Sequence, residues 1–418
     1  MFYFIIAVFL GILCGTAAFV LKWMIAELSY LLTSHFDAKN ANWMLLVLPL
    51  MGIVLAGIFQ RYVIHSKIEH GTERLKADLG QKDYWLRPKM LYAPMTASTI
   101  TLAFGGSAGS EGPIAFTGAA IGSNIAKICG LPANMMMILV GCGAGAGIAG
   151  IFKSPVGGAL FAIEVLGIEL TNIALIALFI TCIVSGLTAY LWDGCTPDVK
   201  FIPTDSFDPS ILPMVIVLGL FCGLYGYFYW YSAQRTRARL DAIKNPWVKN
   251  IVAGGLLSIL IFIFPSLFGE GYGIVGKLIN ETSPNFVADS YLASLPRHAW
   301  IVIVAALGIL ISKGIAATLT NSGGGVAGEF APTLFAGAMA GYFFAFTCNL
   351  AFGLALPTTV FALTGMAATM AAIIGAPLMA IFLTAEMTWN YEFFLPLTVA
   401  AFIAFFTARF LKSLTSKA

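Results

Sequence analysis

Long hydrophobic runs separated by short polar segments make up most of this chain. The first run, residues 1–28, has no basic residue before Lys22, and a second run covers residues 43–59. A helix needs about 20 apolar residues to cross a bilayer, and a secretory signal would begin with basic residues. We therefore expect two membrane-spanning helices here, with the first one retained in the mature protein.

Four later runs are shorter and are interrupted by glycine or proline. They cover residues 88–104, 114–129, 135–151 and 156–170, and they cannot all be complete spans. Irregular backbone at membrane depth is tolerated only where protein or a water-filled cavity satisfies its polar groups. Short, broken helices of this kind favour a buried binding site.

Composition supports the same class of protein. Hydrophobic residues make up 59% of the chain and charged residues 10%, whereas about a quarter of the residues in soluble domains are charged. The sequence thus predicts an all-α integral membrane protein. A net charge of +3 gives no reason to expect a nucleic-acid partner, and seven scattered cysteines without CxxC spacing predict no metal site and no cofactor.

The charged loops predict the orientation in the membrane. Basic residues gather in 61–89, in 235–249 and at the C-terminal end from Arg409, and aspartates gather in 193–208. Basic loops favour the cytoplasmic side. We expect a multi-pass protein of the cell membrane, with the basic loops and the C-terminus in the cytoplasm.

The candidate chemistry lies in residues 105–113, GGSAGSEGP, where a glycine-rich break holds one carboxylate, Glu111. Pro113 stands where a helix can begin, because proline at the first helical position lacks only a donor that had no partner. The amides before it would then be free to face an anion. An ionisable residue at membrane depth is a functional-site hypothesis by default, although Glu111 could instead be a satisfied helix cap.

Two patterns recur in the second half of the chain. Residues 152–164 match 374–386, with Glu164 and Glu386 each nine residues after a proline, Pro155 or Pro377. The break at 105–113 is echoed by 323–332, which ends at Pro332. The two patterns are displaced by 222 and 219 residues, which predicts two structurally related repeats of tilted, broken helices, 1–210 and 211–418. We expect no regulatory C-terminal domain. Inverted repeats are the commoner arrangement, with binding at their interface.

These motifs resemble those of the CLC chloride channels and proton-coupled chloride transporters. Residues 109–113, GSEGP, are similar to the family's G-(K/R)-E-G-P signature, with serine in place of the basic residue, and 328–332, GEFAP, are similar to its G-x-F-x-P motif. Further similarity occurs at 269–273 and 385–391. The resemblance runs from about residue 40 to about residue 410. It implies a CLC-type fold and a homodimer in the bilayer with one pore per subunit.

The resemblance also implies roles for particular residues. Glu111 corresponds to the gating glutamate, which occupies the anion site when ionised and carries the proton in the transporters. Anion-binding groups would come from Gly109, Ser110, Gly112, Glu329, Phe330 and Ala331, and structural roles fall to Pro113, Pro332, Pro155, Pro377, Glu164 and Glu386. His70 falls at the family's chloride-contacting serine, although it could equally belong to a solvated loop.

Several departures from the family pattern leave the coupling to protons open. Val165 replaces the inner proton-relay glutamate of many exchangers, and no tyrosine follows Pro396 at the pore-facing position. Glu329 replaces an aliphatic residue. We expect its carboxyl group to be protonated or turned away from the anion path, because an ionised one would repel chloride; the alternative is a second proton carrier.

The expected function is transport of chloride or a similar monovalent anion through a pore in each subunit, gated by Glu111, with or without proton exchange. The alternatives are an uncoupled passive chloride channel and an exchanger for fluoride or another anion, although fluoride-selective relatives usually depart from the Glu-Gly-Pro sequence that is intact here. An intramembrane enzyme is a remote alternative, because HExxH does not occur and the repeat symmetry has no use in such an enzyme. We expect no enzyme.

Overall fold

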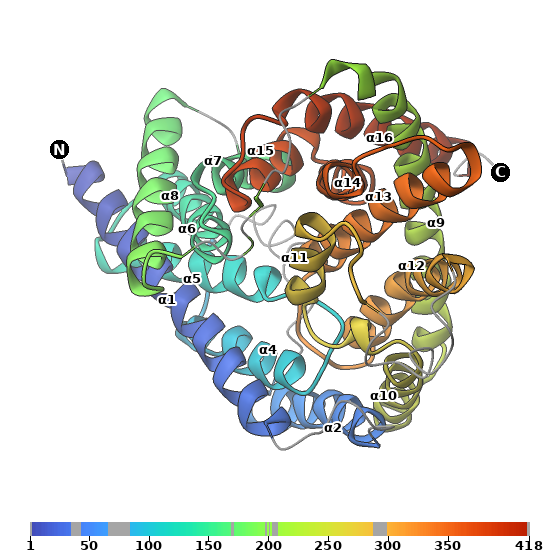
Figure 1. Cartoon of the computed structure of the whole chain (residues 1–418). Helices are drawn as coiled ribbons and strands as arrows, with labels where there is room; N and C mark the ends of the chain where they lie inside the picture. The colour runs from blue at the N-terminus through green and yellow to red at the C-terminus, as the bar shows by residue number, and fades with distance from the viewer. Residues whose placement is uncertain are drawn as a thin grey trace.

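The computed structural model describes residues 2–34, 43–65, 84–168, 171–196, 199, 201–202, 208–286 and 299–415. These ranges form a bundle of tilted helices (Figure 1). The prediction of an all-α membrane fold is confirmed. The α-helices are α1 (Phe2–Thr33), α2 (Met44–Ile58), α4 (Ala93–Ala103), α5 (Glu111–Ile128), α6 (Ala133–Phe152), α7 (Pro155–Leu160), α8 (Asn172–Trp192), α9 (Leu212–Asp241), α10 (Pro246–Ile263), α11 (Tyr272–Asn280), α12 (Ala299–Ser322), α13 (Phe330–Phe352), α14 (Thr358–Ile374), α15 (Pro377–Met387) and α16 (Phe394–Thr415).

Within the described ranges, nine helices are long and apolar enough to cross a membrane. Of the four interrupted runs, only 135–151 forms such a helix, α6, whereas α4 has 11 residues and α7 has six. The break between α6 and α7 lies at Lys153, whose φ of 51° is left-handed, followed by Pro155 at the start of α7. The short segments are thus parts of broken helices, as their glycines and prolines predicted.

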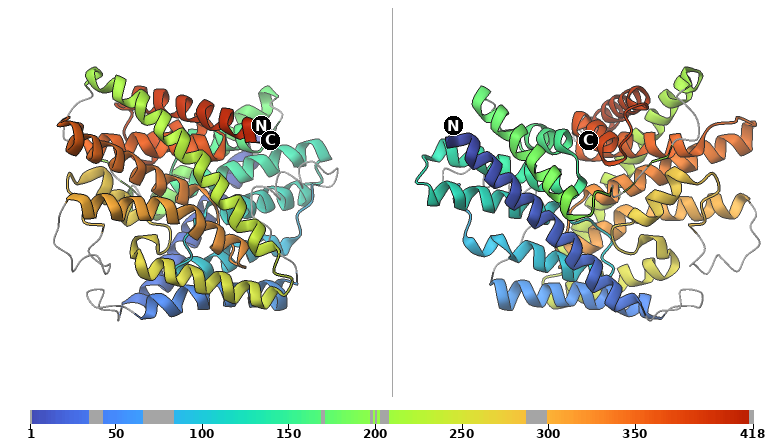
Figure 2. Two further views of the ribbon diagram at one scale, coloured as in Figure 1. Left: turned by 90° about the vertical axis from the view of Figure 1, so that its right-hand side faces the viewer. Right: turned by 60° about the vertical axis from the view of Figure 1, so that its left-hand side comes forward.

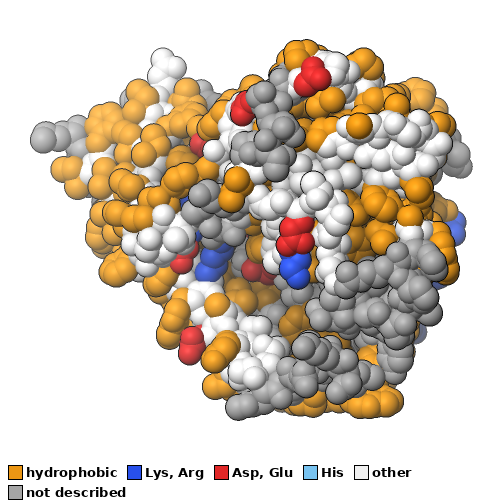
Figure 3. Space-filling model, viewed as in Figure 1, with side chains coloured by type: hydrophobic (Ala, Val, Ile, Leu, Met, Phe, Trp, Pro, Cys, Tyr) orange, Lys and Arg blue, Asp and Glu red, His pale blue; other side chains and the backbone are white. Residues whose placement is uncertain are grey.

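The helices are strongly tilted. Figure 2 shows α1 and α9 crossing the bundle obliquely, with α1 packed on α8 and α9 packed on α16. In Figure 1 the helices of the first half lie mostly on one side and those of the second half on the other. Hydrophobic side chains cover much of the described surface on the face drawn in Figure 3, and the few charged side chains of that face include a group near its middle.

Two threonines tie the glycine-rich breaks of the halves together. Thr320 lies 219 residues after Thr101. The carbonyl oxygen of Thr101 accepts a 2.9 Å hydrogen bond from the Gly106 amide, and that of Thr320 accepts one of the same length from the Gly325 amide. Each also accepts a 3.0 Å bond at its hydroxyl from an amide of the opposite half, Ser107 N to Thr320 Oγ1 and Val326 N to Thr101 Oγ1. The same local geometry therefore occurs twice and is joined reciprocally. The boundary near residue 210 stays a prediction.

A second reciprocal exchange joins α7 and α15. Glu164 accepts hydrogen bonds from the amides of Leu378 (3.2 Å) and Met379 (2.7 Å), at the start of α15. Glu386 accepts from the corresponding amides at the start of α7, which belong to Val156 (3.2 Å) and Gly157 (2.9 Å), and also from the Ser154 hydroxyl (2.6 Å). A carboxylate at a helix N-terminus is favourable because the first amides have no partner within the helix. Each half therefore caps a helix of the other.

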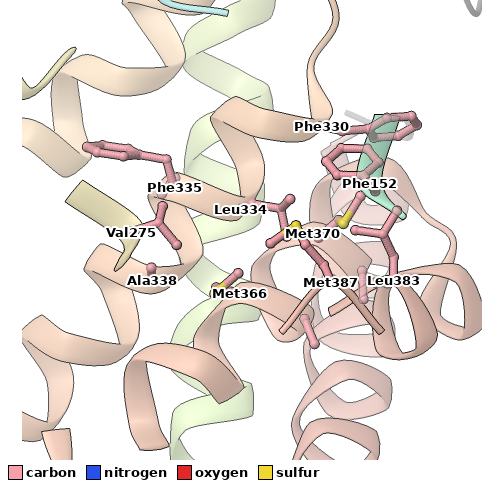
Figure 4. Packing of buried hydrophobic residues seen from close by; sticks show 14 of the residues in the cluster. Phe152, Val275, Phe330, Leu334, Phe335, Ala338, Met366, Met370, Leu383 and Met387 are labelled. Atoms are coloured by element: carbon pink, nitrogen blue, oxygen red, sulfur yellow. The ribbon is translucent and has the colours of Figure 1, made fainter. Parts of the chain in front are cut away.

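Helix α13 lies at the centre of the hydrophobic core. Its residues Leu334 and Phe335 pack in one cluster with Met366 and Met370 of α14 (Figure 4). Small residues allow α13 and α14 to lie close together, since a Cβ added at Gly337 would meet the Met366 Cα at 2.7 Å. This packing fixes the position of the α13 N-terminus, which begins at Phe330.

Candidate functional site

The two glycine-rich breaks meet directly. Gly109 and Gly328 form an antiparallel bridge, in which the Gly109 amide donates to Gly328 O at 3.1 Å and the Gly328 amide donates to Gly109 O at 2.6 Å. A Cβ at Gly328 would lie 2.6 Å from Gly112 N, so this approach requires glycine. The start of α5 is thereby placed against the start of α13.

Both helices begin two residues earlier than the prolines suggested. Helix α5 starts at Glu111 and α13 at Phe330, so Pro113 and Pro332 are third residues rather than first ones. The first four amides of a helix lack an intrahelical partner, and proline at the third position therefore removes no hydrogen bond either. The proline pattern located the helix starts correctly to within two residues.

Glu111 reaches across from one half to the other. Its side chain is fully buried, and the Ala331 amide in the first turn of α13 donates to its Oε1. Its Oε2 has no hydrogen-bond partner in the described part of the chain. The Phe161 ring packs edge-on against the Phe330 ring at this helix start, with centroids 5.6 Å apart. A carboxylate therefore occupies a buried helix N-terminus, which is a favourable place for an anion.

Two of the predicted anion donors are already engaged. The Gly109 amide bonds to Gly328 O, and the Ser110 amide and hydroxyl both donate to Glu270 Oε1, at 2.9 and 2.7 Å. The expectation that these amides are free to face an anion is therefore wrong for this conformation, because a carboxylate before α11 satisfies Ser110. The sequence of residues 269–273 resembles the CLC family, but this resemblance gave no reason to expect a contact between Glu270 and Ser110.

Lys313 in α12 is a site residue that the sequence reasoning missed. It is fully buried, and its Nζ donates to Ser107 Oγ at 2.8 Å, within the same break that carries Glu111. It also lies over the Phe335 ring, 4.7 Å from its centroid. A lysine within an apolar run was the available signal, since charged residues inside membrane helices are usually functional.

A cavity of about 540 Å³ lies next to this cluster. Its lining includes Glu270, the pair formed by Lys153 and Asp193, and Lys22, which faces the Tyr272 ring. Because Glu270 lines the cavity and also binds Ser110, it connects the cavity to the residue that precedes Glu111. The remaining lining is mainly apolar and comes from α1, α4, α6 and α8 and from the segment before α11.

On the other side of the site, Glu329 is turned toward Arg237 of α9, with 3.7 Å between its Oε1 and Arg237 Nη2. Tyr229, two turns earlier in α9, is buried, and its hydroxyl has no hydrogen-bond partner among the described residues. Val165 is buried, and His70 lies outside the described residues. The described residues contain no group of three His, Cys, Asp or Glu side chains that could hold a metal ion.

Broken helices whose starts oppose each other inside an apolar bundle, with a carboxylate between them, define a membrane protein of the ion-transporting class. The chain belongs to the voltage gated chloride channel family, whose model matches residues 51–409. Family membership accounts for the short helices and for both glycine-rich motifs.

Individual relatives agree with this assignment. The chain is 28% identical over 373 residues to a putative chloride channel protein, ClcB-like, of Ralstonia nicotianae, covering 88% of this chain and 82% of the relative. It is 28% identical over 410 residues to an H⁺/Cl⁻ exchange transporter, ClcA, of Citrobacter koseri, covering 96% and 77%. The crystal structure of a slow cyanobacterial Cl⁻/H⁺ antiporter superposes with a TM-score of 0.83 at 23% identity, covering 98% and 94%. By name, these relatives are channels and transporters.

Proposed function

We propose that this protein moves chloride or a similar monovalent anion across the membrane through a pathway in each subunit, with Glu111 as the gate. The observation that carries this proposal is the Glu111 carboxylate on the Ala331 amide. A carboxylate and a chloride ion are interchangeable negative ligands for such amides. Glu111 thus holds the place that an anion takes when the side chain leaves.

Protonation of the Glu111 carboxylate allows its side chain to leave the Ala331 amide. A neutral carboxyl group loses its attraction to the start of α13, and an anion can then replace it among the amides of Ala331, Phe330, Glu329 and Gly112. Fixed amides take over from the hydration shell of the ion, as in other channels and carriers. The Glu329 carboxylate faces Arg237 and so does not oppose the anion at this position.

Proton-coupled exchange is a second candidate. It is favoured by the burial of Glu111, which isolates a proton on this carboxyl group from bulk water, and by the exchange activity in the name of one relative. Val165 cannot carry a proton, so an inner proton route would use Glu329, Tyr229 or His70. Without such a route, the protein is an uncoupled channel.

The proposed setting is the cell membrane, with the basic segments around 61–89 and 235–249 and the C-terminus in the cytoplasm. The positive-inside rule supports this orientation. We also propose a homodimer with two independent pathways, as the family resemblance implies.

The test is transport by purified protein in liposomes under a chloride gradient, with chloride and external pH recorded together. Wild type is compared with Glu111→Gln and with Glu281→Gln, a control at an exposed glutamate. We expect chloride flux in the wild type and the control, and a changed flux with no proton movement in Glu111→Gln. Proton movement driven by chloride in the wild type would establish exchange. Flux of chloride that is identical in all three proteins would refute Glu111 as the gate.

A further inference from the structure

Two charged side chains have no exposed surface at all in the described part of the chain. These are Glu111 in α5 and Lys313 in α12, one from each half. Burying a single charge away from water is very costly unless another charge or several hydrogen bonds compensate for it. The two burials are therefore expected to depend on each other, although no direct ion pair between the two residues is seen.

The contacts of Lys313 place its charge beside the glycine-rich break rather than elsewhere in α12. Its Nζ donates to Ser107 Oγ, and the Ser107 amide donates to Thr320 Oγ1, two turns further along the same helix. The face of the Phe335 ring closes one side of the ammonium group. Lys313 is thus held at the loop that leads into Glu111 by contacts from α12 and α13.

A second carboxylate, Glu270, completes the charge pattern. It accepts two hydrogen bonds from Ser110, the neighbour of Glu111. With Glu111 neutralised or absent, Glu270 leaves a negative charge beside Ser110 and Lys313 a positive charge beside Ser107.

We propose that Lys313 is the fixed cation of the anion site, which offsets Glu270 so that chloride can replace the Glu111 carboxylate. The family signature has a basic residue at the position of Ser110; here a buried lysine from α12 contacts the same glycine-rich break instead. Lys313 acts through the local charge rather than by touching the ion. This inference rests on the proposed function, because it concerns the same anion site.

Isothermal titration of chloride into the purified protein tests the inference in a Glu111→Gln background, where the gate is neutral. Removing the cation with Lys313→Met should weaken chloride binding by about tenfold or more, since a unit charge is lost in a poorly screened site. Glu270→Gln should strengthen binding by a similar factor. The double variant should return to near the starting affinity, and Lys313→Arg should retain it.

The matched control is Thr318→Val in the same helix, whose buried hydroxyl donates to the Gly314 carbonyl oxygen; it should leave chloride affinity unchanged. If Lys313→Met does not fold, the chloride affinities of Glu270→Gln and Lys313→Arg still test the role of Lys313. Chloride affinity unchanged in Glu270→Gln, or a double variant as weak as Lys313→Met, would overturn the role of Lys313. No chloride binding by the Glu111→Gln protein itself would instead overturn the proposed function and this inference together.

Discussion

Removing the reciprocal glutamates should destabilise the protein unequally. Glu386→Ala deletes three hydrogen bonds, from Val156 N, Gly157 N and Ser154 Oγ, whereas Glu164→Ala deletes two. Hydrogen bonds to a charged group contribute about 1.5–3 kcal/mol when buried, and about 1 kcal/mol each is reasonable for these half-buried carboxylates. The expected losses of unfolding free energy are thus about 3 kcal/mol for Glu386→Ala and about 2 kcal/mol for Glu164→Ala.

Unfolding of the detergent-solubilised protein by increasing mole fractions of a denaturing detergent, followed by circular dichroism, measures both losses. Glu386→Gln keeps the size of the side chain and one acceptor oxygen, so it should lose less than Glu386→Ala. Glu392→Ala, in the turn before α16, serves as the control at an exposed glutamate. A larger loss for Glu164→Ala than for Glu386→Ala, or no loss for either, would refute the view that these carboxylates hold the halves together.

Four further predictions follow from the site. Gly328→Ala should abolish chloride flux, because its Cβ would strike Gly112 N, whereas Gly255→Ala in α10 meets nothing within 4 Å and should retain it; equal flux in both would contradict the close approach. Pro113→Ala should leave the helix content by circular dichroism unchanged, since α5 begins before the proline and proline at the third position removes no hydrogen bond; a loss of helix would contradict this. Arg237→Gln should lower chloride flux near neutral pH, because Glu329 then lacks the positive charge of Arg237, and the flux should recover in acid, where the Glu329 carboxylate is protonated; a flux that stays low in acid would exclude this reason. Tyr229→Phe should reduce any chloride-driven proton movement severalfold without loss of stability, since its hydroxyl has no partner to lose among the described residues; unchanged proton movement would remove Tyr229 from the proton route.

The hydrophobic pattern and the motifs were sufficient to predict the class of fold. Apolar runs longer than a bilayer is thick have few alternatives to spanning helices, and the glycine and proline breaks marked where α4 ends and where α7 begins. The repeated distance between proline and glutamate marked Glu164 and Glu386 as equivalent. The pattern did not reveal that each caps the other half, because a local spacing carries no information on a partner more than 200 residues away.

The candidate site was only partly predictable for the same reason. Glu111 could be found because it is an ionisable residue in a glycine-rich break between apolar runs. Ser110, in contrast, was expected to face an anion and instead donates to Glu270, a residue 160 positions later. Lys313 and Tyr229 lie within ordinary apolar helices, and only the packing of α12 and α9 brings them to the site.

The most direct test of the central claim is crystallography of bromide-soaked protein, because bromide replaces chloride and is located by its anomalous scattering. The Glu111→Ala protein is compared with wild type at the start of α13. Bromide within hydrogen-bond distance of the Ala331 amide in Glu111→Ala, and absent there in wild type with Glu111 in place, is the predicted result. Bromide absent from this amide in Glu111→Ala, or present beside an undisplaced Glu111 in wild type, would contradict the claim that anion and carboxylate compete for one place.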